Sequence, residues 1–168
     1  MMPARGFPSA EYKARTDAAQ DRMRSENLAA LLLTTEPDVR YFTGFLTRFW
    51  ESPTRPWFLV VPQEGDPIAV IPAIGQALMA QTWIEDIRTW DAPDYKDDGV
   101  TLLQAALNEV AGAEGRIGTP MRLESHLRMP LADWARLTQD QPERFVSDQG
   151  IVAGLRSIKS KAEIAKIE

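Results

Sequence analysis

The chain contains one histidine and no cysteine, and these two counts limit the chemistry open to it. Without cysteine there is no disulfide, no thiolate nucleophile and no cysteine-ligated zinc. Any reaction that needs an imidazole must use His126, which directly follows Glu124 and Ser125. Sequence neighbours do not face one another on a helix, and on a strand only the outer two of three share a face. This run therefore does not make a catalytic set by itself, although a small enzyme built on it stays an alternative.

The acidic residues Asp94, Asp97 and Asp98 gather in a polar loop before an apolar helix that begins at Val100. Capping of that helix by Asp97 or Asp98 explains them more simply than cation binding. The glycines of the chain lack the spacing of a phosphate-binding loop. We therefore predict neither a catalytic residue nor a metal ligand within this chain.

The stretch Asp38–Pro62 combines many aromatic residues with three arginines. Its aromatic residues are Tyr41, Phe42, Phe45, Phe49, Trp50, Trp57 and Phe58, and its arginines are Arg40, Arg48 and Arg55. Aromatic and arginine side chains on a loop between rigid elements are typical of binding surfaces. A half-buried hairpin whose aromatic rings fill the core is equally compatible with these residue types.

The composition narrows the class of protein. With 168 residues, 44% hydrophobic and 26% charged, the chain has the size and composition of one globular domain. A net charge of −5 argues against a nucleic-acid partner, which needs a basic surface. No run approaches the roughly 20 apolar residues of a membrane span. We expect a cytoplasmic domain with no membrane or nucleic-acid partner.

Short strands alternate with helices along the sequence. Apolar runs predict strands at 28–34, 57–61, 68–71, 87–90, 115–118 and 144–147. Periodicity and capping signals predict helices at 10–26, 36–44, 74–83, 100–113 and 131–137, and on both sides of a joint at 158–160. Because 57–71 is typical of an antiparallel hairpin, we predict a single α/β domain with a mixed central sheet flanked by helices.

The two ends of the chain differ from its middle. Residues 1–7 are expected to be a flexible tail. Ser160 and Glu163 fit a capping box, in which each side chain accepts a hydrogen bond from the other residue's backbone N–H. Ile164 and Ile167 follow on that helix with no partner in the sequence. We expect the protein to continue beyond Glu168, although a frayed last helix is the alternative.

Three segments together resemble a known family. A helix precedes the apolar strand LAALLLTT, the segment PDVRYFTGF is close to the pattern N-I-x-Y-L-T/S-G-F, and GLRSIKSKAEIAKIE follows near residue 160. This order resembles the N-terminal domain of creatinase, prolidase and aminopeptidase P, the "pita-bread" hydrolases. The resemblance implies a ribonuclease H-like fold over 8–156. It also implies that 157–168 links to the first helix of an absent C-terminal catalytic domain.

The same resemblance implies a function. The full-length protein is expected to cleave a C–N amide bond in a small peptide or amide, as an Xaa-Pro peptidase or a creatinase-like hydrolase. Peptidase members use two divalent metal ions (Mn, Co or Zn) held in the absent domain, whereas creatinase uses none. The present domain is expected to be inactive alone and to join a homodimer.

On the resemblance, the substrate-contacting side chains of this domain are expected to be Arg48, Phe49, Trp50 and Arg55. Arginine can hold a carboxylate with two hydrogen bonds, and an aromatic ring can close a pocket. The alternative function is a non-catalytic interaction domain of a protein whose hydrolase half is inactive.

Overall fold

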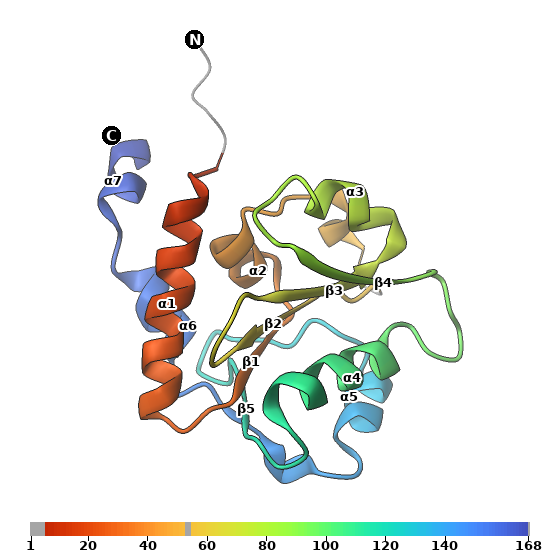
Figure 1. Ribbon diagram of the computed structural model, residues 1–168. Coiled ribbons are helices and arrows are strands. Elements are labelled where there is room, and N and C mark those ends of the chain that lie inside the picture. Colours follow the sequence, from red (N-terminus) through yellow and green to blue (C-terminus); the bar gives the residue numbers. More distant parts are fainter. Residues whose placement is uncertain (1–5, 53–54, 168) are drawn as a thin grey trace.

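The computed structural model describes residues 6–52 and 55–167, which form a six-stranded sheet with helices on both faces (Figure 1). The strand order is β4-β3-β2-β1-β5-β6. The strands are β1 (Ala30–Leu33), β2 (Phe58–Pro62), β3 (Ile68–Pro72), β4 (Asp86–Trp90), β5 (Ile117–Thr119) and β6 (Phe145–Ser147).

The sheet is mixed. β2 is antiparallel to both β1 and β3, whereas β3–β4, β1–β5 and β5–β6 are parallel pairs. A five-residue connection, 63–67, joins β2 to β3 and makes the predicted hairpin. The parallel neighbours are instead joined by connections that contain helices, as parallel pairing requires. The predicted single-domain α/β fold with a mixed sheet is therefore confirmed.

The helices vary widely in length. The α-helices are α1 (Ser9–Ser25), α2 (Glu36–Thr43), α3 (Gln76–Met79), α4 (Val100–Ala111), α5 (Leu131–Thr138), α6 (Ile151–Ser157) and α7 (Lys161–Ile167). Three 3₁₀ turns are η1 (Arg48–Glu51), η2 (Ala73–Gly75) and η3 (Pro142–Arg144).

Each face of the sheet has its own apolar core because successive strand residues point to opposite sides. On β1, Leu31 and Leu33 pack with the helices α1, α2 and α6, whereas Ala30 and Leu32 pack with α4 and α5. Figure 1 shows the two layers, with α1, α2, α3 and α6 on one side and α4 and α5 on the other. The strands β2 and β3 repeat this alternation.

Two local predictions are wrong. The single helix expected over 74–83 is only η2 followed by α3, because the Thr82 hydroxyl donates to the Met79 carbonyl and ends the turn there. Ser9 was expected to cap α1, but the helix already includes it. The carbonyl of Pro8 instead accepts the Glu11 N–H, at 2.9 Å.

The start and the end of the described chain meet on α1. Residues 1–5 of the predicted tail lie outside the described residues, but the Phe7 N–H donates to the Tyr12 hydroxyl at 3.1 Å. Arg15 is buried, and its guanidinium lies over the Phe7 ring at 4.6 Å and over the Tyr41 ring at 4.4 Å. Glu163 of α7 pairs with the same guanidinium at 3.4 Å.

The capping box at the start of α7 forms as predicted. The Ser160 N–H donates to Glu163 Oε2 at 2.9 Å, and the Glu163 N–H donates to Ser160 Oγ at 3.1 Å. Ile164 and Ile167 are exposed on this helix, as expected from the sequence. No helix among the described residues is long and apolar enough to span a membrane.

Candidate functional site

Three connections that are distant in sequence meet at one edge of the sheet. β1, β3, β4, β5 and β6 all end at this edge, and β2 begins there. The chain entering β2, the loop 91–99 after β4 and the loop 120–130 after β5 therefore lie together. Ligands of open α/β sheets bind outside the carboxyl ends of the strands. This carboxyl edge is the candidate site.

The predicted site residues lie on the connection into β2, and we call residues 48–52 together with Arg55 the arginine segment. α2 ends at Gly44 in the left-handed conformation (φ 76°), which glycine adopts without strain. η1 then begins after Thr47, whose hydroxyl accepts the Phe49 N–H at 3.2 Å. This turn leaves the Arg48 side chain 94% exposed, with Glu51 3.7 Å away as its partner.

Aromatic rings fix the inner side of the arginine segment. Trp50 is buried, and its ring centroid lies 5.9 Å from that of Trp57 and 6.4 Å from that of Phe45. Phe49 stacks on Trp57 at 6.1 Å but keeps 45% of its surface exposed. The backbone at Gly75 supports the cluster, since a Cβ there would lie 2.2 Å from the Trp57 ring. The segment is thus a thin layer over the core.

Arg128 braces the arginine segment from the loop 120–130. Its guanidinium donates to the carbonyls of Arg55 at 2.6 Å, Trp50 at 3.3 Å and Ser52. The same group lies 5.0 Å from the centre of the Trp50 ring. The backbone N–H of Arg128 donates to Thr34 Oγ1, just past the end of β1, at 2.9 Å. Partial burial lowers the pKa of Arg128, which nevertheless remains a cation.

Asp98 orients Arg55 from the third connection. Its Oδ2 lies 3.4 Å from the Arg55 guanidinium, and its Oδ1 accepts the Trp90 indole N–H at 3.0 Å. The Arg55 side chain is 35% exposed, so part of it still faces solvent. Asp98 therefore fixes the orientation of the Arg55 side chain without burying it completely.

The rest of the acidic loop serves the fold. Asp97 Oδ1 accepts the Thr101 N–H at 3.0 Å, so Asp97 caps the first turn of α4 as predicted. Burial would raise the pKa of Asp97, but the hydrogen bonds from Thr101 and the charge of Arg136 outweigh it and lower that pKa. Burial, followed by the nearby charge of Asp98, raises the pKa of Asp133. Burial thus favours a higher pKa at both carboxylates, and only at Asp97 do the partners reverse its effect.

The structure separates the four predicted site residues into two groups. Arg48 and Phe49 are exposed and Arg55 is half-buried, so these three present surface to solvent. Trp50 lies in the core beneath them, where its ring contacts Arg128. The core-filling interpretation of Asp38–Pro62 therefore holds for Trp50, whereas exposure alone does not test the binding-surface interpretation. A substrate role for the four residues stays a prediction.

Among the described residues, no catalytic set is assembled around His126. Glu124, Ser125 and His126 are all exposed on the loop 120–130. Within 6–52 and 55–167, no three His, Asp or Glu side chains gather in a group that could hold a metal ion. The described residues therefore offer no site for the two divalent ions, which the resemblance places in another domain, and their binding there stays a prediction.

Two of the three sequence segments that carry the family resemblance are in contact. Asp38 of α2 pairs with Arg156 of α6 at 2.8 Å, and the Tyr41 hydroxyl donates to the Leu155 carbonyl at 3.3 Å. The Thr35 hydroxyl donates to the other oxygen of Asp38 at 2.7 Å. Burial raises the pKa of Tyr41, although the charge of Arg15 opposes this, so the phenol stays protonated at neutral pH. PDVRYFTGF and GLRSIKS, which contain most of α2 and part of α6, therefore pack against each other.

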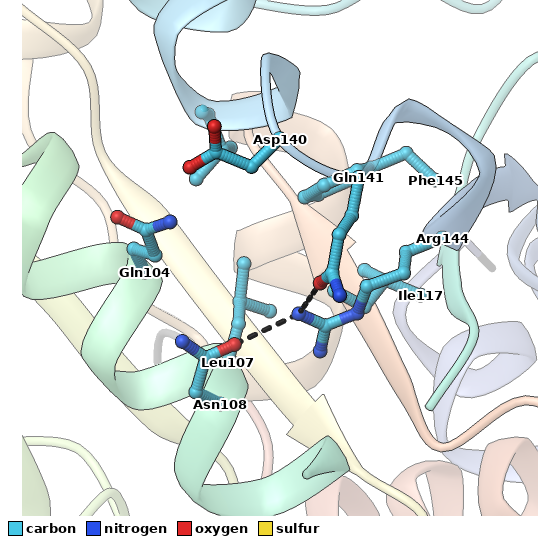
Figure 2. Close-up of a pocket in the computed structure, with 9 residues that line it drawn as sticks. Gln104, Leu107, Asn108, Ile117, Asp140, Gln141, Arg144 and Phe145 are labelled. Carbon is cyan, nitrogen blue, oxygen red and sulfur yellow. Dashed lines mark hydrogen bonds between the residues drawn. The ribbon is translucent and has the colours of Figure 1, made fainter. Parts of the chain in front are cut away.

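A small pocket lies at the opposite edge of the sheet, around Arg144 (Figure 2). Its volume is about 20 Å³, room for one water molecule. Arg144 donates to the side chains of Asn108 at 2.8 Å and Gln141 at 3.1 Å, and to the carbonyls of Gly112 at 2.7 Å and Gly115 at 3.2 Å. A second hollow, of about 220 Å³, lies between the end of α1 and the start of α6. Neither contains a residue of the arginine segment.

Comparisons with known proteins agree with this architecture. The sequence profile of the Creatinase/Prolidase N-terminal domain matches residues 15–158. Dipeptidase PepE from Mycobacterium ulcerans superimposes with a TM-score of 0.72 at 26% identity, over 95% of this chain and 40% of that one. Prolidase from Thermococcus sibiricus gives a TM-score of 0.72 at 18% identity, over 92% of this chain and 39% of that one. A search of curated proteins found no match.

A separately solved domain shows the same fold. The Creatinase/Prolidase N-terminal domain of an X-Pro dipeptidase from Streptococcus pyogenes superimposes with a TM-score of 0.65 at 19% identity. The superposition covers 84% of this chain and 98% of that one. The present chain thus spans about two fifths of the dipeptidase and prolidase chains and nearly all of the isolated domain. The chain belongs to the Creatinase/Prolidase N-terminal domain family.

Proposed function

We propose that this chain is the non-catalytic N-terminal domain of a longer hydrolase that cleaves a C–N amide bond in a small peptide or amide. The observation that carries the proposal is the family match over 15–158 together with the superposition on 40% of a dipeptidase chain. The metal-dependent chemistry would then belong to another domain of that longer protein. Two divalent ions (Mn, Co or Zn) bound there would activate the attacking water.

The test compares the chain with the full-length protein on Xaa-Pro dipeptides and on creatine. We expect the full-length protein to hydrolyse one of these classes. Activity on Xaa-Pro dipeptides should be lost with a chelator and regained with Mn, Co or Zn, whereas activity on creatine should not depend on a metal. The chain 1–168 alone is expected to be inactive. Hydrolysis by the chain alone would contradict the proposal. A stable full-length protein without activity on either class would instead favour the interaction-domain function.

We further propose that the arginine segment forms part of the wall of the substrate pocket. The Arg48 side chain is almost fully exposed and that of Arg55 partly so, and a guanidinium can hold a substrate carboxylate with two hydrogen bonds. The exposed part of Phe49 would close the pocket beside them, and buried Trp50 would support it from below. A homodimer in the cytoplasm stays a prediction, and its subunit count can be measured by light scattering.

Steady-state kinetics of the full-length protein tests the pocket wall. Arg48→Ala and Arg55→Ala are expected to lower kcat/KM by about tenfold each, the scale of one lost charge-assisted hydrogen bond. Arg24→Ala is a matched control, because Arg24 is a surface arginine on α1 paired with Asp21. Unchanged kcat/KM in both test variants would remove the arginine segment from the site.

A further inference from the structure

We propose that Arg128 is a positioning residue: it holds the arginine segment in a preformed shape, so that Arg48, Phe49 and Arg55 are presented to a ligand without reordering. The role in ligand binding rests on the proposed function above, but the positioning role does not. The inference starts from the direction of the hydrogen bonds at this guanidinium.

Three carbonyls of one short segment converge on the Arg128 guanidinium. They belong to Trp50, Ser52 and Arg55, so the contacts span nearly the whole arginine segment. Buried or half-buried carbonyls need a donor, and a planar guanidinium can serve several at once. A single side chain from another loop therefore adds hydrogen bonds to the few that the short turn η1 makes by itself.

The brace is itself held at both ends. Its backbone N–H is fixed by the Thr34 hydroxyl, which follows the buried strand β1. Its guanidinium is fixed from below by the Trp50 ring, which the core encloses. Movement of Arg128 would thus break contacts to the sheet and to the aromatic cluster together. This makes the brace rigid relative to the segment that it supports.

The guanidinium of Arg128 forms no ion pair with a carboxylate among the described residues. Within the described residues, no carboxylate oxygen lies within 4.0 Å of this guanidinium, and Glu36 contributes only a longer-range attraction. Its hydrogen-bond partners are neutral carbonyl groups, so its positive charge is not neutralised and contributes to the local electrostatic potential. Arg128 adds positive potential behind Arg48 and Arg55, which suits a ligand that presents a carboxylate.

Preorganisation gives the brace a consequence for binding. A segment that must order itself around a ligand loses affinity through the conformational entropy of its side chains and backbone. If Arg128 holds the shape beforehand, its loss should weaken binding without moving the reacting groups. In the full-length protein this predicts a higher KM with little change in kcat.

The experiment measures amide hydrogen exchange in the chain 1–168 with Arg128→Met, Arg128→Lys and Arg144→Met. In Arg128→Met the amides of 48–52 are expected to exchange at least tenfold faster than in the wild type, after correction for global stability. Arg128→Lys keeps the charge but cannot reach three carbonyls, so it is expected to lie between these two. Arg144→Met should leave 48–52 unchanged after the same correction, because Arg144 contacts other loops.

A fluorescence measurement adds an independent signature. Removing the cation from the Trp50 ring is expected to change tryptophan emission in Arg128→Met and not in Arg144→Met. If Arg128→Met does not fold, Arg128→Lys carries the exchange measurement. Exchange at 48–52 that matches the wild type, or that rises equally across the whole chain, would overturn the positioning role.

Kinetics of the full-length protein separates this inference from the proposed function. If Arg128→Met, Arg48→Ala and Arg55→Ala all raise KM, both stand. If local exchange rises but none of the three variants changes KM, Arg128 still positions the segment and the pocket wall is contradicted. If Arg55→Ala raises KM while Arg128→Met changes neither exchange nor KM, the pocket wall stands and the brace is overturned.

Discussion

Arg128 and Arg144 have similar chemistry at opposite edges of the sheet, yet they do different things to the fold. Burial lowers the pKa of both, and both donate to backbone carbonyls. The partners of Arg144 come from α4, the following turn and η3, so it ties together elements that close the core. The carbonyl partners of Arg128 belong to one surface segment. Arg144 therefore connects elements around the core, whereas Arg128 stabilises one segment at the surface.

The surroundings of the two arginines support this distinction. Around Arg144 the remaining space is about one water molecule, and polar side chains fill its rim (Figure 2). Around Arg128 the neighbouring Phe49 and Arg48 face solvent. Also nearby, the indole N–H groups of Trp50 and Trp57 are buried without a partner among the described residues. The carboxyl edge therefore carries unpaired buried indole groups and exposed apolar surface.

The largest expected effect on stability comes from Arg144. Arg144→Met removes four hydrogen bonds and leaves two carbonyls, Asn108 and Gln141 without this donor. We expect unfolding free energy to fall by about 3 kcal/mol, measured by urea denaturation. Arg128→Met should lose less globally, because its partners lie near solvent. Equal losses for the two variants would erase the difference between the edges.

A smaller effect should arise where the core supports the arginine segment. Gly75→Ala places a methyl group 2.2 Å from the Trp57 ring, whose other neighbours include Phe49. Because the backbone at Gly75 (φ −91°) suits alanine, the cost should come from overpacking and reach about 1–3 kcal/mol.

A double-mutant cycle checks the cause of that loss. Trp57→Phe shortens the ring, so adding Gly75→Ala in this background should cost clearly less than it does in the wild type. Unfolding free energies of the four proteins supply the comparison. Additive losses would show that the methyl group acts through some other neighbour.

The smallest effect concerns Asp133, whose pKa is raised by burial and then by Asp98. The folded protein thus holds this proton more tightly than the unfolded chain does. Stability is therefore lost as pH rises from the ordinary value of 3.8 through the raised value. Asp133→Asn should raise the unfolding free energy at pH 7 by less than about 1 kcal/mol, which thermal unfolding would record as a small rise in melting temperature. This gain should vanish below pH 3.8.

Asp140→Asn is the control for this charge effect. Asp140 is an exposed carboxylate on the Arg144 side of the molecule (Figure 2). Its substitution is expected to leave the melting temperature nearly unchanged at both pH values. A gain at Asp140 equal to that at Asp133 would point to net charge rather than to the local repulsion.

Much of the fold could be predicted because its signals are local. Apolar runs mark β1 and β2. The Pro- and Gly-containing turn 63–67 marks β3, which forms the hairpin with β2. The capping box at Ser160 needed only its own four residues. The helix expected at 74–83 failed because a side-chain hydroxyl competes with the helix for one carbonyl. No periodicity records that competition.

The candidate site was only half accessible to the same reasoning. The aromatic residues and arginines of the connection into β2 stand together in the sequence, so they could be singled out. Arg128 lies 73 residues from Arg55, and Asp98 lies 43 residues from it. Neither stands in a motif, and only the strand order brings them together. Trp50 could not be assigned to core or surface, since indole suits both.

The carboxylate of Glu163 joins two events that are usually separate. One oxygen caps α7 by accepting the Ser160 N–H, and the other pairs with Arg15 on α1. Starting this helix and docking it are thus linked equilibria: each favours the other by the same free energy. A force that pulls α7 away from α1 would also loosen its first turn. The position of α7 against α1 and the order of its first turn are therefore coupled through the single carboxylate of Glu163.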